Sequence, residues 1–332
     1  MTVDTVSTEA PPSATTPGET GASPADESRI EAGSHAYDDF REALFASGVL
    51  FDTGQEGVYG YSGTYQRIVT GLDRLVTELG RSAFEPVHFP PVLVRPTFDR
   101  TGYLHSFPDL MGSVHVFRGG NKEHRELSKR YDEGGNWPEL LEPAEVVLSS
   151  AACHSLYPLC TGTLPTGGRY FEIQNWCFRH EPSPDPARMV AFRMHELVYV
   201  GDPDTAQTYR DTMLPQGVQL LADLGLPMDV VPANDPFFGR LGTLKASAQL
   251  EENLKLEGVT PICSEEKPTA IISGNCARDH FGEPFDIATS TGEVAHSSCV
   301  AFGIDRIVLA LLHRHGLDPA TWPADVRQRL WA

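Results

Sequence analysis

The feature that most constrains the fold is a pair of strand-like segments, residues 168–179 and 191–201, joined by a proline-rich loop. The strands read FEIQNWCFR and AFRMHELVYVG, and the loop reads HEPSPDPARMV. This pattern predicts an antiparallel hairpin with a long tip. Because helical segments lie between such strands, we expect an α+β fold and not a doubly wound parallel sheet. No glycine-rich signature of a Rossmann or P-loop site occurs, so neither site is expected.

The segments around the hairpin have equally clear patterns. Residues 64–80 carry apolar side chains at helical spacing and end on Gly80, which predicts a helix. The following VHFPPVLVRP is extended, and its prolines suit an edge or interface strand. Residues 204–225 and 243–257 are predicted to be helical. Near the C-terminus, VAFG is expected to run directly into a helix, IDRIVLALLHRHG.

Composition limits the setting and the partners. The 332 residues include 45 Asp and Glu against 26 Lys and Arg, a net charge of −19, which argues against a large nucleic-acid footprint. Residues 1–35 hold almost no large apolar side chains and are expected to be a disordered tail, leaving 36–332 as one catalytic domain. Six cysteines without a C-x-x-C pair indicate reduced thiols, and no membrane span or signal peptide is predicted. We therefore expect a cytoplasmic protein.

The polar residues of the hairpin suggest a phosphate site. Arg179 offers a planar fork of donors, and Glu181, two residues on, is expected to share its face. Phe192 offers a flat surface on which a base can stack, and Arg188 lies on a loop that could close over phosphates. An isolated R-x-E would more simply be a surface salt bridge, but the whole string between two strands is more specific.

These residues resemble motif 2 of the class II aminoacyl-tRNA synthetases, closest to the seryl branch. The helix at 64–80 with HFPP is similar to motif 1, and AFGIDR is similar to motif 3, with Ala301 where glycine is more usual. The three motifs occur in the family's order. The resemblance implies an antiparallel sheet flanked by helices, ATP bound in a bent form, and a homodimer.

By this resemblance Arg179 and Arg306 are the catalytic residues, on the α-phosphate and on the far end of the triphosphate. Glu181 would contact the adenine edge and Phe192 would stack on the ring. One departure is Thr269, which stands where the seryl pattern has a metal-binding glutamate, so the protein ligand of the Mg²⁺ that accompanies ATP is not predicted. Further nucleotide-binding residues are Arg188 and Met189 of the loop, Lys255 on an expected helix, and Ala270, Ile271, Ile272 and Ser273.

Cys153, Glu196 and Cys299 form a candidate metal site. Free cysteines are more often small buried residues than ligands. In an atypical branch of the synthetases, however, a Cys, a Glu and a Cys at corresponding places hold Zn²⁺. Three protein ligands leave one tetrahedral position for the substrate's α-amino group, so Glu196 also counts as substrate-binding. Three histidines adjoin these residues and could ligate instead, or could lie around the metal without binding it: His154, His195 and His296. The remaining cysteines are expected in the core: Cys160, Cys177, Cys263 and Cys276.

The chain has no segment that resembles a tRNA-binding arm. A synthetase core with this Cys/Glu/Cys set and no such arm resembles the amino acid–carrier protein ligases. That resemblance implies adenylation of glycine or alanine, then transfer to the phosphopantetheine thiol of a carrier protein. Three alternatives stay open: a truncated seryl-type tRNA synthetase, a non-catalytic regulatory paralogue and an unrelated zinc hydrolase. Residues 118–131 are one candidate for carrier docking, although a solvated helix face explains that charge run more simply.

Overall fold

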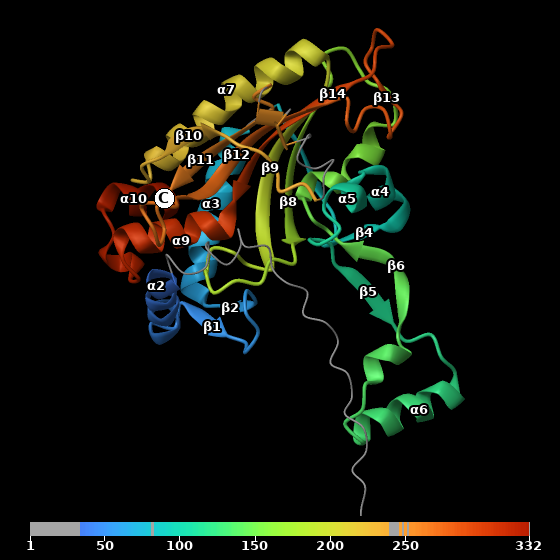
Figure 1. Cartoon of the computed structure of the whole chain (residues 1–332). Coiled ribbons are helices and arrows are strands. Elements are labelled where there is room, and N and C mark those ends of the chain that lie inside the picture. Colours follow the sequence, from blue (N-terminus) through green and yellow to red (C-terminus); the bar gives the residue numbers. More distant parts are fainter. Residues whose placement is uncertain (1–33, 81–82, 239–245, 248, 251, 332) are drawn as a thin grey trace, which may run out of the picture.

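A seven-stranded sheet forms the centre of the computed structural model, which describes residues 34–80, 83–238, 246–247, 249–250 and 252–331 (Figure 1). Neighbouring strands are antiparallel, except for the edge strand β3, which runs parallel to β8. This topology confirms the expected α+β class. In spatial order the strands are β10 (Asp229–Pro232), β11 (Lys255–Thr260), β12 (Thr269–Arg278), β14 (His296–Gly303), β9 (Ala191–Gly201), β8 (Arg169–Phe178) and β3 (Glu85–His88).

The predicted hairpin is β8 and β9, and it lies well inside the sheet. The two strands pair from Arg169 opposite Val200 to Phe178 opposite Ala191. On its other side β9 pairs with β14, which sets Glu196 opposite Ala301. The sheet therefore brings the motif 2-like and motif 3-like segments side by side.

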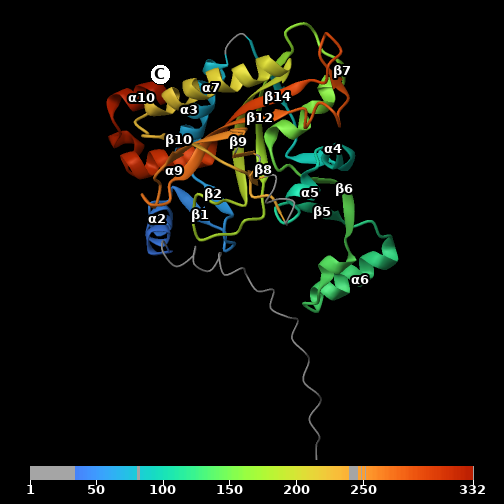
Figure 2. The same cartoon turned by 45° about the horizontal axis from the view of Figure 1, so that its top comes forward.

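Three helices cover one face of the sheet: α3 (Gly63–Leu79), α7 (Pro203–Ala222) and α9 (Ile304–His315). Figure 2 shows them stacked over the central strands. Ser62 caps α3, since its side chain accepts a hydrogen bond from the amide of Tyr65. All three helices were expected, α9 directly after β14. Their apolar faces bury a large core against the sheet, which supplies most of the driving force for this layer.

Shorter elements extend this body at both chain ends. Helix α2 (Ser34–Ala46) and a small hairpin, β1 (Leu50–Asp52) with β2 (Tyr59–Tyr61), precede α3. Helix α10 (Ala324–Trp331) closes the chain and packs on α3. The predicted tail, residues 1–35, lies outside the described residues except for its last two, with which α2 begins.

A second, three-stranded sheet extends from the body. Its strands are β4 (Val92–Val94), β6 (Glu142–Leu148) and β5 (Ser113–Val116), with the short helices α4 (Arg95–Arg100) and α5 (Tyr103–Ser106) beside it. Helix α6 (Asn121–Asp132) projects beyond this sheet and buries no side chain (Figure 1). A two-residue parallel pair joins β7 (Gly162–Thr163) to β13 (Ile287–Ala288).

One expected helix is wrong in its described C-terminal part. Residues 255–257 of the predicted helix 243–257 belong to β11, which pairs with β10 on one side and β12 on the other. Positions 243–245, 248 and 251 lie outside the described residues. None of the described helices combines the length and apolar content needed to cross a bilayer.

Candidate functional site

The two faces of the central sheet have different roles. Along β9 the side chains alternate, so Phe192 and Glu196 point to one face while Arg193 and His195 point to the other. The second face carries α3, because His195 hydrogen-bonds to Asp73 of that helix. We call it the helix face, and the opposite one the site face.

Three arginine side chains converge on the site face. Burial lowers the pKa of Arg306, and the nearby positive charges of Arg188 and Arg179 lower it further. The guanidinium of Arg306 is held by main-chain carbonyls, with Nε donating to Ala187 (2.9 Å) and Nη1 to Ala270 (3.0 Å). Three positive charges this close together repel one another. A polyanionic ligand bound between them would replace that repulsion with attraction, so the cluster suits such a ligand. The sequence had predicted all three residues for the site.

Phe192 and Glu181 lie beside these arginines. The Arg179 guanidinium lies 5.5 Å from the centre of the Phe192 ring, and its Nε donates to the Ser150 carbonyl at 3.2 Å. Arg179 itself follows the end of β8 by one residue. Glu181 is the ion-pair partner of Arg188, with 3.6 Å between Oε1 and Nη1. An aromatic ring, the guanidinium of Arg179 and the more exposed guanidinium of Arg188 therefore lie close together.

Lys255 differs from expectation in two ways. It opens strand β11 and is not carried on a helix. Its ammonium is also engaged, 2.6 Å from Asp235 Oδ1 and 2.9 Å from Glu257 Oε1. Burial disfavours the charge of Lys255, but these two carboxylates outweigh burial and raise its pKa. A phosphate at this lysine would have to exchange with at least one carboxylate.

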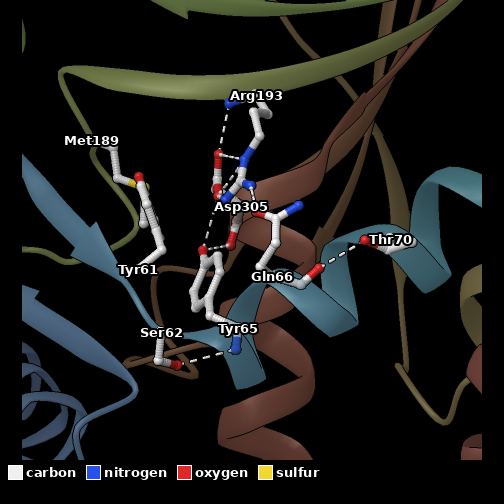
Figure 3. A network of polar contacts seen from close by, with 8 residues as sticks. All are labelled: Tyr61, Ser62, Tyr65, Gln66, Thr70, Met189, Arg193 and Asp305. Atoms are coloured by element: carbon white, nitrogen blue, oxygen red, sulfur yellow. Dashed lines mark hydrogen bonds and ion pairs between the residues drawn. The ribbon is translucent and has the colours of Figure 1, made fainter.

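The remaining predicted nucleotide residues divide between the two faces. Ile272 points to the helix face, since a side chain added at Gly217 of α7 would meet its Cδ1 at 2.6 Å. Only the main chain of Ile272 can therefore line the site face. Met189 is also buried, and its sulfur accepts a hydrogen bond from the Tyr61 hydroxyl at 3.5 Å (Figure 3). Ile271 is buried as well, whereas Ala270 and Ser273 stay partly exposed.

Cys153, Glu196 and Cys299 meet on the site face although they are far apart in sequence. Hydrogen bonding to Cys299, then burial and the charge of Glu196, raises the pKa of the Cys153 thiol. Burial likewise raises the pKa of Glu196, whose Oε1 accepts from the amides of Ala152 (2.9 Å) and Cys153 (3.4 Å). The second oxygen, Glu196 Oε2, is buried and makes no hydrogen bond to any of the described residues.

These donors fit a soft divalent cation in type, because two sulfurs and one carboxylate are ligands that Zn²⁺ accepts. An orphaned carboxylate oxygen inside a protein is costly, and a cation would satisfy it. Within the described ranges, no three His, Cys, Asp or Glu side chains are arranged as a formed metal site. The chemistry of the donor set thus supports zinc binding as a proposal.

The histidines that adjoin these donors differ from each other. His154 is buried, which lowers its pKa to about 3, so it is neutral at pH 7. His195 is fully buried between Asp73 (3.1 Å) and Glu172 (3.1 Å), and these hydrogen bonds outweigh burial and raise its pKa. Strand alternation points His195 away from Glu196, so its ring lies on the helix face and not beside the metal-donor candidates. Of the four cysteines expected in the core, Cys160, Cys177 and Cys276 are buried, and Cys263 is partly buried.

A network on the helix face was missed by the sequence analysis (Figure 3). The Asp305 carboxylate, only 1% exposed, accepts from the Arg193 amide (2.6 Å), the Arg193 guanidinium and the Tyr65 hydroxyl (3.0 Å). Arg193 also donates to Gln66 at 2.7 Å and lies 4.8 Å from the centres of the Tyr61 and Trp176 rings. Both charged residues are chain neighbours of predicted site residues, Phe192 and Arg306, and strand alternation could have assigned Arg193 to the opposite face.

The sheet topology, the helix layer and the three motif-bearing segments define a class II aminoacyl-tRNA synthetase-like catalytic fold. The seryl-tRNA synthetase of Methanopyrus kandleri, crystallised with a tRNASec from A. aeolicus, superposes with a TM-score of 0.74 at 24% identity. That match covers 88% of this chain but 60% of the synthetase chain. The seryl-tRNA synthetase of Pyrococcus horikoshii, crystallised with ATP, superposes with a TM-score of 0.62 at 14% identity.

The family itself follows from closer relatives. Amino acid–(acyl-carrier-protein) ligases 1 and 2 of Bradyrhizobium diazoefficiens are 42% and 41% identical to this chain over 287 residues. The first match covers 86% of this chain and 88% of the relative. A type-2 serine–tRNA ligase of Methanopyrus kandleri is 28% identical, and the chain spans 53% of its length. No protein-family profile matches the chain. The chain belongs to the amino acid–(acyl-carrier-protein) ligase family and is a ligase.

Proposed function

We propose that this protein uses ATP to activate glycine or alanine as an aminoacyl-adenylate and transfers it to the phosphopantetheine thiol of a carrier protein. The observation that carries the proposal is the convergence of Arg179, Arg188 and Arg306 beside Phe192, in a member of a carrier-protein ligase family. Three guanidinium groups around one space match a triphosphate, and the aromatic ring matches a base.

In the first step the amino acid carboxylate attacks the α-phosphorus of ATP. A carboxylate–phosphorus bond forms, the bond to the bridging oxygen breaks, and pyrophosphate leaves with the electron pair. Arg179 stabilises the charge that builds on the α-phosphoryl oxygens, and Arg306 holds the far end of the triphosphate in line. Arg188 closes on the phosphates after exchanging its contact with Glu181, which then becomes available to the adenine amino group. Mg²⁺ accompanies ATP, and no protein ligand is assigned to it.

In the second step the carrier's thiol attacks the carbonyl carbon of the adenylate. A carbon–sulfur bond forms, the carbon–oxygen bond to phosphate breaks, AMP leaves, and the thiol proton passes to solvent. The adenylate is a mixed anhydride, so positioning suffices and the enzyme needs no nucleophile of its own. This accords with the site-face residues, which bind and orient and include no Ser–His–Asp arrangement among those described.

Cys153, Glu196 and Cys299 would hold one Zn²⁺ per subunit, with the unpartnered Glu196 Oε2 among its ligands. When bound, the metal would offer an open position to the neutral α-amino group of the substrate. The remaining wall of this region supports a small substrate. Tyr157, close enough to Cys153 and Cys299 for their charges to affect its pKa, stacks on Phe281 with 4.0 Å between ring centres. We propose that this closely packed aromatic pair limits the length of the substrate side chain.

The acceptor is proposed to be a carrier protein and not tRNA. The net charge of −19 disfavours a polyphosphate partner, and the relatives that are 42% and 41% identical are named as ligases of an acyl-carrier protein. Helix α6 is a candidate docking surface, because none of its side chains is buried and Arg118, Lys122, Arg125 and Lys129 lie on or beside it. We also propose a cytoplasmic homodimer that forms through α3 and the edge strand β3.

The first test is amino-acid-dependent ATP–pyrophosphate exchange with all twenty amino acids, with and without a zinc chelator. Strong exchange with glycine or alanine alone, lost on chelation and restored by Zn²⁺, is the expected result. A thioester on holo but not apo carrier protein then tests the second step. Exchange with no amino acid would overturn the ligase proposal in favour of a regulatory paralogue, and charging of tRNA would favour a truncated seryl-type enzyme.

A charge-reversal pair separates docking from activation. Arg125→Glu with Lys129→Glu should slow transfer to the carrier severalfold while pyrophosphate exchange stays unchanged, because the substitutions lie far from the arginine cluster. Metal content, measured by mass spectrometry of purified protein, is a readout for Cys299→Ser that does not depend on activity. One equivalent of zinc in the wild type and none in the variant is expected.

A further inference from the structure

The loop between β8 and β9, residues 179–190, is held on two sides. From helix α9, Arg306 Nε donates to the carbonyl of Ala187. From outside the sheet, Arg41 of helix α2 donates from Nη1 to the carbonyl of Pro184 at 3.0 Å. The loop therefore has main-chain partners in a segment that the sequence analysis left without a role.

Gly57, in the turn between β1 and β2, makes the closest approach to the loop. Its carbonyl accepts from the amide of Val190 at 2.8 Å. Its φ of +73° is one that residues with side chains rarely adopt. A Cβ at this position would lie 2.9 Å from Val190 Cγ2 and 3.3 Å from Val190 N. The turn thus needs glycine both for its backbone conformation and for this contact.

Burial shows how completely the loop is fixed. Asp185, Ala187, Met189 and Val190 are all less than 9% exposed, whereas the side chain of Arg188 between them is 54% exposed. Tyr61 of β2 supplies a further contact through its hydrogen bond to Met189 (Figure 3). Residues 185–190 are therefore packed in place, while the head group of Arg188, which pairs with Glu181, stays accessible to a ligand.

We propose that α2 and the β1–β2 hairpin form a clamp that preorganises this loop for ATP, with Arg41 and Gly57 as its positioning residues. The proposal rests on the proposed function for the identity of the ligand. Neither residue is assigned a contact with ATP. Ordering loop residues on binding costs conformational entropy, so a loop that is fixed before ATP binds spares the complex that cost. Loosening the clamp should therefore weaken ATP binding and leave the amino acid site unaffected.

Gly54 offers a matched control for Gly57. It lies in the same turn with a φ of +78°, but nothing is within 4 Å of its Cβ position. Alanine introduces a similar backbone strain at either position, and only Gly57→Ala pushes against the loop. In pyrophosphate exchange we expect Gly57→Ala to raise the KM for ATP about tenfold with the KM for the amino acid unchanged. Gly54→Ala should stay within about twofold of the wild type for both substrates.

Limited trypsin digestion gives a readout that does not need activity. Cleavage after the exposed Arg188 should be several times faster in Gly57→Ala and in Arg41→Ala than in the wild type or Gly54→Ala. Arg41→Lys, which keeps the charge and a donor, should restore most of the protection, and the Arg41 variants cover the case in which Gly57→Ala does not fold.

Equal ATP KM values and equal cleavage rates in the Gly54 and Gly57 variants would overturn the clamp. Failure of the proposed function looks different, because the wild type would then show no exchange while the cleavage comparison could still be made. A loss of affinity for both substrates together would also contradict the clamp, since it indicates a general structural defect.

Discussion

Two polar clusters on opposite faces of the central sheet differ in how far their buried groups are paired. On the helix face, Asp305 and Arg193 satisfy one another, with Tyr65 and Gln66 completing the network. On the site face, Glu196 Oε2 has no partner among the described residues and Arg306 is repelled by Arg188 and Arg179. Buried polar groups are costly unless paired. A network complete within the chain therefore indicates a structural role, and an incomplete one indicates a ligand.

The largest effect is expected when the network of Asp305 and Arg193 is broken. Asp305→Ala leaves the guanidinium of Arg193 mostly buried without its carboxylate, which should lower the free energy of unfolding by about 3–5 kcal/mol. Urea denaturation followed by circular dichroism measures this change. The control is Glu85→Ala, which removes an ion pair to Arg169 whose carboxylate side chain is 55% exposed, and which should cost less than about 1 kcal/mol. Equal losses in the two variants would contradict the assignment of a structural role to Asp305.

Substitutions on the site face should lower activity more than they lower the free energy of unfolding. Arg306→Gln removes a charge from the arginine cluster but keeps an amide donor for the carbonyls of Ala187 and Ala270. Pyrophosphate exchange should fall at least about 100-fold, because transition-state charge loses its partner. The unfolding free energy should change by less than about 1 kcal/mol, since relieved repulsion offsets weaker hydrogen bonds. A variant that loses as much stability as Asp305→Ala would contradict this contrast.

Metal binding sharpens the comparison further. Zinc at about 100 times its dissociation constant should raise the unfolding free energy of metal-free protein by about 2.7 kcal/mol, because only the folded state brings the three donors together. Cys299→Ser should abolish most of this increment. Cys263→Ser, a change at a partly buried thiol outside the donor set, should keep it. Thermal denaturation with and without zinc measures both, and an equal increment in the two variants would exclude Cys299 as a ligand.

The smallest effect concerns pH and Asp185. Burial raises the pKa of this carboxyl in the folded protein, so the folded state binds its proton more tightly than the unfolded state does. The stability that protonation supplies is complete below about pH 4 and is lost as the pH rises through the folded-state pKa. Asp185→Asn resembles the protonated form. Its advantage over the wild type, up to about 1 kcal/mol, should be present at pH 7 and absent at pH 3.5 in urea titrations. A pH-independent difference would contradict this reasoning.

Most of the fold could be predicted from local patterns. The hairpin boundaries differ from the observed strands by about one residue, and α3 ends at the expected glycine. The exception, residues 255–257, shows the limit of such patterns. These residues pair with partners distant in sequence, such as Asn275 opposite Lys255, and sheet pairing on both sides outweighed local helical preference.

The sequence predicted which residue types gather at the candidate site, but not which of them are already paired with other side chains. The three arginines lie near one another, and so do the three metal-donor candidates, of which Glu196 and Cys299 are brought together by the pairing of β9 with β14. Their roles in binding stay predictions. The ion pairs of Lys255 and the hydrogen bonds of His195 to two carboxylates could not be predicted, since Asp235, Asp73 and Glu172 become their neighbours only in the folded chain. The contacts of Gly57 and Arg41 with the loop have the same origin.

The sequence alone determined the fold class, the three motifs and the chemical types of the site residues, because alternation, helical spacing and turn residues act over a few positions. Only the tertiary structure decided which charges are paired, which are left for a ligand, and which face of the sheet each side chain serves. Pairing and burial depend on contacts between segments far apart in the chain, and the pKa of a side chain follows from those contacts.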